Sequence, residues 1–308
     1  MNMLQKLYKK AFCVMQWNIG IAKADIRRII TTKTFDAEPV WLTIDDQDTS
    51  IADPFILEDG RGNLLLAYED FSMTDPCRYG ILRLKTLNAN LEPLDDKVLL
   101  DVKKHLSYPA FFSDNNTLYI IPESRHCNEV AGYEFDPTQK NILNKKIIFG
   151  NIPLLDPTLL KYNNKYWLFA TYGDRKHEHS KLYIYFADTL NGPYTPHPKN
   201  PVRQGLKGTR PAGNFICIDN HIYRPAQNCE GYYGKSLVIN KINKLSETEF
   251  EETQHMEITA PPRAKYNAGI HTLSISGNFI AIDGIWLKFA PLTKLKTKLK
   301  KITKRLKA

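Results

Sequence analysis

Residues 51–70 read Ile-Ala-Asp-Pro-Phe-Ile-Leu-Glu-Asp-Gly-Arg-Gly-Asn-Leu-Leu-Leu-Ala-Tyr-Glu-Asp. Two apolar runs flank a turn rich in glycine and asparagine, a pattern that predicts an antiparallel β-hairpin. The first run begins near Asp53-Pro54, and the second ends with Glu69 and Asp70. Because the start of one strand lies beside the end of its antiparallel partner, we expect these three carboxylates to share one edge of a sheet.

Four more hairpins repeat this plan. Their turn asparagines, together with that of the first hairpin, are separated by 53, 48, 56 and 58 residues: Asn63, Asn116, Asn164, Asn220 and Asn278. An X-Pro dipeptide opens four of the five units, with further strand-like runs between them. A period of about 50 residues with roughly four strands per unit indicates a β-propeller. The sequence therefore predicts an all-β, five-bladed β-propeller over residues 17–288, in which the strand 17–22 completes the last blade and closes the ring.

The two ends of the chain lie outside this repeat. Residues 1–16 are expected to form a short helix, and residues 289–308 a basic amphipathic helix. Eight basic residues and no acidic ones lie between Lys294 and Lys307, so the net charge of +9 falls to +1 without them. A nearly neutral body argues against a nucleic-acid partner. The tail is expected to lie on an anionic membrane surface, with a partner protein or the propeller itself as the alternative. The residues expected at the membrane are Leu292, Leu295, Lys298, Leu299, Lys301, Ile302, Arg305 and Leu306.

The five cysteines are widely spaced and contain no CxxC pair, which argues against a disulfide framework and a zinc site. No secretory signal is recognised and no apolar run approaches the ~20 residues of a membrane span. We therefore expect a cytoplasmic protein, peripherally associated with the inner face of the cell membrane. No cofactor and no metal are expected, because His177-Glu178-His179, although spaced like a metal pair, falls in a polar loop.

The inner strands of a propeller line a central channel, where the starts of the first strands and the ends of the second strands converge. This predicts a concave, mixed-charge pocket at the axis. Its expected catalytic residues are Asp53, Glu123 and Asp156, and its expected substrate-binding residues are Glu69, Asp70, Tyr108, Arg125, Arg210, Arg224, Gln227, Asn228 and His271. The alternatives are structural: Asp-Pro pairs also cap strand starts, and the two arginines could simply neutralise axial carboxylates.

Short motifs add a resemblance. Ala-Asp-Pro (52–54), Leu-Asp-Pro (155–157) and the segment 188–194 resemble the propellers of family 43 glycoside hydrolases. This resemblance implies sugar chemistry, with Asp53 as general base and Asp156 as an orienting carboxylate. Tyr-Pro-Ala (108–110), Pro-Glu-Ser (122–124), Arg-Pro-Ala-Gly-Asn (210–214) and Arg-Pro-Ala-Gln (224–227) are more similar to the N-terminal propeller domain of plant glucosamine inositolphosphorylceramide transferases and its stand-alone bacterial relatives.

The chain departs from the family 43 pattern on the fourth blade, where Arg210 stands in place of the acidic glutamate. Glu123 is the substitute, although a paired Arg125 would lower its pKa. Arg210 and Arg224 match the phosphates of a sugar nucleotide or lipid-linked sugar. These features favour glycosyl transfer in cell-surface polysaccharide or glycolipid synthesis, with Asp53 as the base. The alternatives are a glycoside hydrolase with Glu123 as acid and a non-catalytic glycan-binding scaffold.

Overall fold

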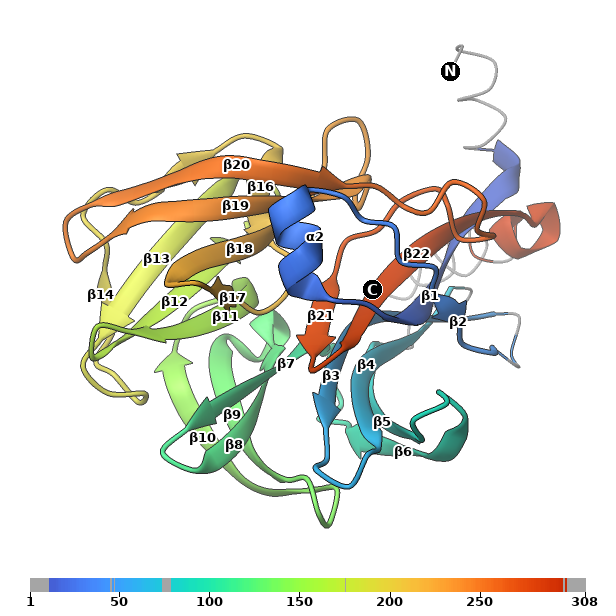
Figure 1. The fold of residues 1–308 in the computed structure, drawn as a ribbon, viewed down its shortest axis with the longest axis horizontal. Helices are drawn as coiled ribbons and strands as arrows, with labels where there is room; N and C mark the ends of the chain where they lie inside the picture. The colour runs from blue at the N-terminus through green and yellow to red at the C-terminus, as the bar shows by residue number, and fades with distance from the viewer. Residues whose placement is uncertain are drawn as a thin grey trace, which may run out of the picture.

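The protein is a five-bladed β-propeller. The computed structural model describes residues 11–44, 46, 48–73, 79–174, 176–295 and 297. Within them, five antiparallel sheets surround a common centre (Figure 1). The predicted fold class and the number of blades are therefore confirmed.

Each blade is numbered in chain order. Blade 1 contains β3 (Thr49–Glu58), β4 (Leu64–Ser72), β5 (Ile81–Leu87) and β6 (Pro93–Leu100). Blade 2 contains β7 (Ser107–Asp114), β8 (Thr117–Glu123), β9 (Glu129–Asp136) and β10 (Asn141–Gly150), with the 3-10 helix η1 (Arg125–Cys127) after β8. Blade 3 contains β11 (Leu154–Tyr162), β12 (Lys165–Tyr172), β13 (Lys181–Ala187), β14 (Thr195–Pro196) and β15 (Arg203–Gln204). Blade 4 contains β16 (Lys207–Pro211), β17 (Ile216–Ile218), β18 (His221–Asn228), β19 (Ser236–Leu245) and β20 (Phe250–Ile258).

Blade 5 closes the ring with both ends of the chain. Its strands are β21 (Leu273–Ser276), β22 (Phe279–Phe289), β1 (Cys13–Lys23) and β2 (Val40–Trp41). β1 pairs with β22 over its whole length, with Trp17 opposite Ile285. The closing strand predicted from the sequence is confirmed, but it begins at Cys13 rather than at Trp17. Residues 13–16, which were expected in the N-terminal helix, are strand because the edge of β22 offers them backbone partners; residues 1–10 lie outside the described range.

The expected hairpin turns occur at the asparagines. Asn116, Asn164 and Asn220 have φ angles of 64°, 57° and 61°, in the left-handed region that asparagine tolerates better than most residues. In the first hairpin the Asp59 carboxylate accepts hydrogen bonds from both the backbone and the side chain of Asn63. Asparagine takes the left-handed position in three of these turns, and glycine takes it in the first and fifth hairpins, at Gly60, Gly62 and Gly277.

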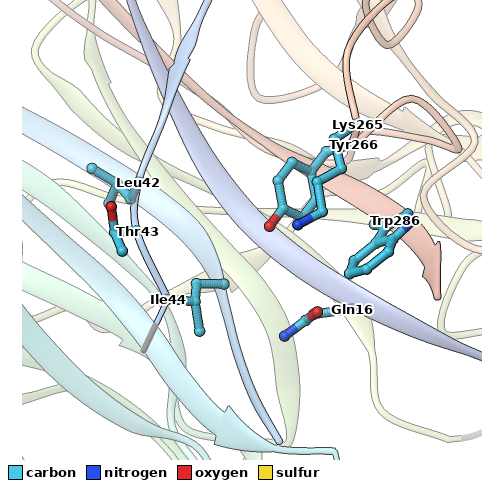
Figure 2. Close-up of a pocket in the computed structure, with 7 residues that line it drawn as sticks. All are labelled: Gln16, Leu42, Thr43, Ile44, Lys265, Tyr266 and Trp286. Carbon is cyan, nitrogen blue, oxygen red and sulfur yellow. The ribbon is translucent and has the colours of Figure 1, made fainter. Parts of the chain in front are cut away.

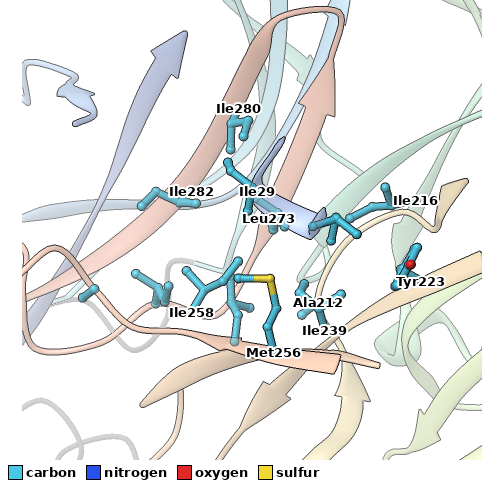
Figure 3. Close-up of a cluster of buried hydrophobic side chains, with 14 residues drawn as sticks. Ile29, Ala212, Ile216, Tyr223, Ile239, Met256, Ile258, Leu273, Ile280 and Ile282 are labelled. Carbon is cyan, nitrogen blue, oxygen red and sulfur yellow. The ribbon is translucent and has the colours of Figure 1, made fainter. Parts of the chain in front are cut away.

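One helix, α2 (Ile26–Thr32), covers the junction between blades 4 and 5. Asp25 caps its N-terminus by accepting hydrogen bonds from the backbone of Arg27 and Arg28. Its Ile29 and Ile30 are buried in a cluster that contains Ile239, Met256 and other apolar residues of both blades (Figure 3). This packing explains why a segment without a clear strand pattern lies between β1 and β2.

The chain leaves the propeller after β22. Residues 291–295 are helical, and the side chains of Leu292 and Leu295 are 73% and 54% exposed. The other residues expected at a membrane lie outside the described range, namely Lys298, Leu299, Lys301, Ile302, Arg305 and Leu306. Among the described residues, no helix has both the length and the apolar character needed to cross a bilayer.

Candidate active site

The innermost strands of three blades share a β-bulge that directs side chains to the centre. The strand register shifts next to Asp53, Tyr108 and Asp156. These residues have φ angles of 51°, 50° and 50°, and each precedes a proline. A non-glycine residue before proline rarely adopts this left-handed conformation, which costs on the order of 1–3 kcal/mol. The recurrent X-Pro dipeptides of the sequence mark these strained positions, and packing of the whole ring holds them.

Acidic side chains at the ends of the second strands reach the same region. Glu69 lies opposite Ala52, and Glu123 lies opposite Ser107, in each case beside the bulge of the inner strand. Both carboxyl groups are buried. Burial raises the pKa of Glu69 well above its usual value, and the charges of Asp53, Glu123 and Asp156 raise it further. The predicted convergence of carboxylates from three blades is therefore observed.

Asp53 lies at the junction of blades 5, 1 and 2. Its Oδ1 accepts a hydrogen bond of 2.6 Å from Thr272 Oγ1, and its Oδ2 accepts one of 3.2 Å from the backbone N–H of Tyr108. Burial raises the pKa of Asp53 to about 6, although the charge of the nearby His271 acts in the opposite direction and lowers it. At neutral pH this carboxylate is ionised but holds a proton far more readily than an exposed aspartate does.

His271 is held between two carboxylates. Its Nδ1 lies 2.5 Å from Asp283 Oδ2 and its Nε2 lies 3.4 Å from Asp53 Oδ1. Although burial opposes the charge, Asp283 and Asp53 raise the pKa of His271 above its usual value. The Trp17 ring packs 4.1 Å from the imidazole, centroid to centroid. Sequence reasoning placed His271 here but missed Trp17, Thr272 and Asp283, because no motif distinguishes them from ordinary strand residues.

The same three groups could hold a cation. Asp53, His271 and Asp283 offer ligand atoms that all lie within 4.8 Å of one another. A protonated imidazole already neutralises one of the two carboxylates at this position, so the arrangement is satisfied by a proton on His271. This grouping was not identified from the sequence, where only His177, Glu178 and His179 were weighed as a metal pair and no metal was expected.

Glu123 and Glu69 flank a second imidazole, that of His105. His105 Nε2 lies 3.6 Å from Glu69 Oε1 and 3.9 Å from Glu123 Oε2. The backbone N–H of Gly80 donates to His105 Nδ1, so the hydrogen of the neutral ring is on Nε2, facing both carboxyl groups. Burial, with help from His126 and Arg125, lowers the pKa of His105 to about 4. A side chain at Gly80 would collide with the Glu69 carboxylate, which accounts for glycine at that position.

Glu123 is protonated far more readily than the sequence suggested. Its Oε2 accepts a hydrogen bond from Ser107 Oγ and its Oε1 accepts one from the backbone N–H of Arg125. Burial is the largest influence and, with the charge of Asp156, raises the pKa of Glu123 to about 7. Arg125 does lower this pKa, as expected, but its Nε is 4.0 Å from Glu123 Oε1 and its Nη1 binds Glu178. Burial therefore outweighs the arginine.

Arg210 neutralises Asp156. Its Nε and Nη2 donate to the two carboxylate oxygens at 2.5 and 3.0 Å, and Gln227 Nε2 donates to Oδ2 at 3.2 Å. The remaining Nη1 lies 3.1 Å from His179 Nδ1, and the guanidinium carbon lies over the Tyr233 ring. The sequence left two roles open for Arg210, and these contacts fit the structural one, in which the arginine neutralises a carboxylate at the axis.

Two residues expected at the centre lie elsewhere. Arg224 is 1% exposed and donates from Nε and Nη2 to Glu252 at 2.9 and 2.6 Å, inside blade 4. Asn228 donates to Ser236 and Glu257 in the same blade. Their strand β18 is paired regularly with β19 at these positions, so nothing turns their side chains toward the axis. The expectation that they bind substrate is corrected: both stabilise the blade.

Two further expected residues lie beneath or beside the centre. Tyr108 is fully buried, and its hydroxyl meets Thr158 Oγ1 and accepts from the backbone N–H of Gly213, so it joins blades 2, 3 and 4 beneath the carboxylates. Asp70 is buried, with a carboxylate oxygen 4.0 Å from Arg83 Nε. Tyr108 thus connects the blades around the site through its hydroxyl, and Asp70 lies beside the site on blade 1.

Comparisons with known proteins agree with this architecture. Residues 43–276 match the family described as glucosamine inositolphosphorylceramide transferase 1, N-terminal. The chain therefore belongs to this family. Two relatives, both named glucosamine inositolphosphorylceramide transferase 1, are 31% identical: that of Oryza sativa subsp. japonica over 207 residues and that of Arabidopsis thaliana over 211 residues. Each match covers 66% of this chain and only 27% of the relative, so the chain spans about a quarter of their length.

Solved structures share the fold at low identity. A GH43 β-1,3-galactosidase with galactodeoxynojirimycin has a TM-score of 0.55 at 8% identity, covering 71% of this chain and 82% of its own. A family 117 glycoside hydrolase from Zobellia galactanivorans has a TM-score of 0.53 at 13% identity, covering 90% and 91%. An exo-β-1,3-galactanase from Clostridium thermocellum has a TM-score of 0.54 at 12% identity, covering 74% and 57%. These likenesses bear on the fold alone.

Proposed function

We propose that the chain is a carbohydrate-active domain that transfers a glycosyl group, with Asp53 as the catalytic base. The observation that carries this proposal is the environment of Asp53, a buried carboxylate at the centre of the propeller whose pKa is raised to about 6. A base with a pKa slightly below neutral is ionised at pH 7 and still accepts a proton effectively in a transition state. Membership of a family whose curated relatives are named transferases supports transfer.

In the proposed step, the hydroxyl oxygen of an acceptor attacks the anomeric carbon of a donor sugar. The hydroxyl proton passes to an Asp53 oxygen, and the bond between the anomeric carbon and the departing phosphate oxygen breaks, its electron pair leaving with the phosphate. Thr272 and the backbone of Tyr108 hold the two Asp53 oxygens in place before the proton arrives. His271 lies against Oδ1 and favours the ionised base.

The other carboxyl groups are suited to holding sugar hydroxyls. Glu69 and Glu123 have raised pKa values, so in their protonated forms they both donate and accept hydrogen bonds. Asp156 remains a fixed acceptor because Arg210 pairs with it. A sugar nucleotide or lipid-linked sugar is the proposed donor. Arg224 would not bind the phosphate of this donor, because its guanidinium pairs with Glu252. In Arg210, only Nη1 is not bonded to Asp156 and could donate a hydrogen bond to the phosphate.

A hydrolase with Asp53 as base and Glu123 as acid is the second candidate. One observation favours it: the pKa of Glu123 is raised to about 7, so a large share of this carboxyl group carries the proton that a general acid needs. Hydrolysis and transfer differ in whether water or a sugar hydroxyl takes up the glycosyl group, and the same base serves both.

The deciding experiment measures both products. The full chain is incubated with a panel of sugar nucleotides and acceptor glycans, and with aryl glycosides, and products are followed by mass spectrometry. Asp53→Asn should lower transfer by about 10²–10⁴-fold with the melting temperature changed by only a few degrees. Asp114→Asn, which alters a buried carboxylate bound to Lys161 and Tyr166 away from the centre, is the matched control and should keep its activity. A fully active Asp53→Asn protein contradicts the proposal, and release of free sugar alone selects the hydrolase.

We also propose that the C-terminal segment holds the domain on an anionic membrane, at the cytoplasmic face. Leu292 and Leu295 are exposed at the start of this segment, and the lysines that follow in the sequence complement acidic headgroups. Sedimentation with vesicles that contain phosphatidylserine should recover the full chain, and Leu292→Asp with Leu295→Asp should release it. Equal binding to neutral vesicles would contradict the electrostatic part of the proposal.

A further inference from the structure

A pocket lies on blade 5, lined by other residues than those of the carboxylate centre. Its volume is about 210 Å³, and its residues come from β1, β22 and the segments that follow β2 and β20 (Figure 2). The lining residues are Gln16, Leu42, Thr43, Ile44, Lys265, Tyr266 and Trp286. Gln16 precedes Trp17, but neighbouring residues of a strand point to opposite faces. Trp17 packs on His271 at the centre, whereas Gln16 faces this pocket.

The sheet holds the walls of the pocket in place. Gln16 and Trp286 lie opposite each other in paired strands, and the Gln16 amide donates to the backbone carbonyl of Thr49 at 2.8 Å. The Tyr266 ring is wedged between two tryptophans, 4.8 Å from Trp41 and 6.5 Å from Trp286, centroid to centroid. The aromatic surfaces therefore exist before any ligand arrives, which lowers the cost of binding.

Polar tips converge in the same space. Figure 2 shows the Tyr266 hydroxyl, the Lys265 ammonium and the Gln16 amide pointing into the hollow, across from Leu42 and Ile44. The Tyr266 ring is buried, whereas its hydroxyl is accessible from the pocket and has no hydrogen-bond partner among the residues that the structure describes. This group is thus a donor and acceptor available to a ligand.

Lys265 supplies a positive charge to the pocket, and no carboxylate among the described residues pairs with it. Its Nζ lies 4.1 Å from the centre of the Trp286 ring and 5.4 Å from that of Tyr266. None of the lining residues is acidic, and within the described part of the chain Lys265 has no carboxylate partner. The lysine therefore covers an aromatic platform while its charge remains available to an anion.

We infer that this pocket binds one hydroxylated six-membered ring that carries a phosphate or carboxylate group. The anionic group pairs with the Lys265 ammonium and draws it aside from the Trp286 ring, the face of the ligand ring packs on the indole, and the Tyr266 hydroxyl and Gln16 amide meet the ring hydroxyls. Aromatic side chains suit the apolar face of such a ring, and a lysine suits its anion. The inference stands apart from catalysis at Asp53, because none of the residues of the pocket contacts the carboxylate centre.

The test follows the indole N–H resonance of Trp286 in the ¹⁵N-labelled full chain, identified by its loss in Trp286→Phe. The probes are glucose 1-phosphate, glucuronate, glucose and inorganic phosphate. Glucose 1-phosphate or glucuronate should shift the resonance saturably, and glucose and phosphate should each bind about tenfold more weakly. A response to only one of the two anionic rings identifies the group that Lys265 recognises.

Lys265→Ala should weaken binding of the anionic ring about five- to tenfold. Lys23→Ala is the matched control, because Lys23 also lies over an aromatic ring of blade 5, 5.6 Å from Phe279, but away from the pocket. It should leave binding unchanged. No saturable shift with either anionic ring, or equal affinity in Lys265→Ala and the parent chain, overturns the inference. Activity of the Asp53→Asn protein has no bearing on this result, and that protein should bind the probes normally.

Discussion

Arg210 and Arg224 stand in the same dipeptide, Arg-Pro, on two paired strands of blade 4, β16 and β18, yet they have different surroundings. Each forms a two-pronged pair with a carboxylate: Arg210 with Asp156 of blade 3, and Arg224 with Glu252 of its own blade. Arg210 lies within an irregular stretch between Lys207 and Pro211, whereas Arg224 sits in regular pairing opposite Asn240. The local backbone, rather than the dipeptide, decides which arginine reaches the centre.

The comparison also explains the charge of the centre. Arg210 is committed to one carboxylate, and the other arginine of the pair lies inside the blade. Among the described residues, no arginine pairs with Asp53 or Glu69, and Glu123 has only Arg125, with its Nε at 4.0 Å; burial raises the pKa of all three acids. Asp156 is paired with an arginine, while burial raises the pKa of its acidic neighbours, an arrangement that separates positioning from proton transfer.

The largest effect is expected from Arg224→Met. This change leaves Glu252 buried without its main partner, so the free energy of unfolding should fall by about 3–5 kcal/mol. Urea denaturation followed by tryptophan fluorescence measures the loss. Arg203→Met is the matched control: Arg203 touches Glu252 through Nη1 at 3.0 Å but is more exposed, so its loss should stay near 1 kcal/mol or less. Equal losses in the two variants would contradict the structural role assigned to Arg224.

Compared with Arg224→Met, Arg210→Met should lower the free energy of unfolding less and the rate of glycosyl transfer more. Arg210 is less buried than Arg224, with 10% against 1% of its side chain exposed, and Gln227 still donates to Asp156 in the variant, so about 1–3 kcal/mol is expected. Transfer should fall by more than tenfold in the folded protein. Adding Asp156→Asn should restore stability, because the unpaired charge disappears, without restoring activity. Recovery of activity in the double variant would show that Arg210 only balances charge.

A third prediction concerns Glu123, one of the acids whose pKa is raised by burial. Folded Glu123 keeps its proton up to about pH 7, whereas the unfolded chain releases it near 4.5. The parent protein therefore loses stability through this group as the pH rises from about 4.5 to about 7. Glu123→Gln does not titrate, so its stability relative to the parent should rise across that window, by about 3 kcal/mol. His105, whose pKa is lowered to about 4, has the opposite effect in both proteins, so it largely cancels in the difference.

The control for this third prediction is Asp114, a carboxyl group whose pKa is shifted downward in the folded protein, opposite to that of Glu123. The pKa of Asp114 is lowered by Lys161 and Tyr166 against the effect of burial. Its contribution to stability is present above the unfolded value of 3.8 and is lost as the pH falls through the folded pKa. Asp114→Asn should therefore be less stable than the parent at neutral pH, with a difference that shrinks in acid. Thermal unfolding between pH 3 and pH 8 measures both variants.

The sequence predicts the frame of the molecule better than the details of its centre. The X-Pro dipeptides and turn asparagines recur along the chain, so the five blades and Asp53, Asp156 and Glu123 follow from local pattern. His105, Thr272 and Asp283 do not, because their roles depend on contacts between blades that no local pattern encodes. Arg224 was misplaced for the same reason: its dipeptide repeats that of Arg210, while the regular pairing that buries it appears only in the folded sheet.

The smallest expected effect is on the pKa of Glu123, which should respond to the charge of Arg210 but not to that of Arg224. The charge of Arg210 lowers the pKa of Glu123, so Arg210→Met should raise that pKa further, on the order of half a pH unit. Arg203→Met and, where it folds, Arg224→Met should leave it unchanged, because their charges face Glu252 inside the blade. Titration of ¹³C-labelled glutamate carboxyls resolves such a shift, with Glu123→Gln assigning the signal. An equal shift in all three variants would mean that the centre senses the net charge of blade 4 rather than Arg210, and the distinction between the two arginines would then hold for structure but not for electrostatics.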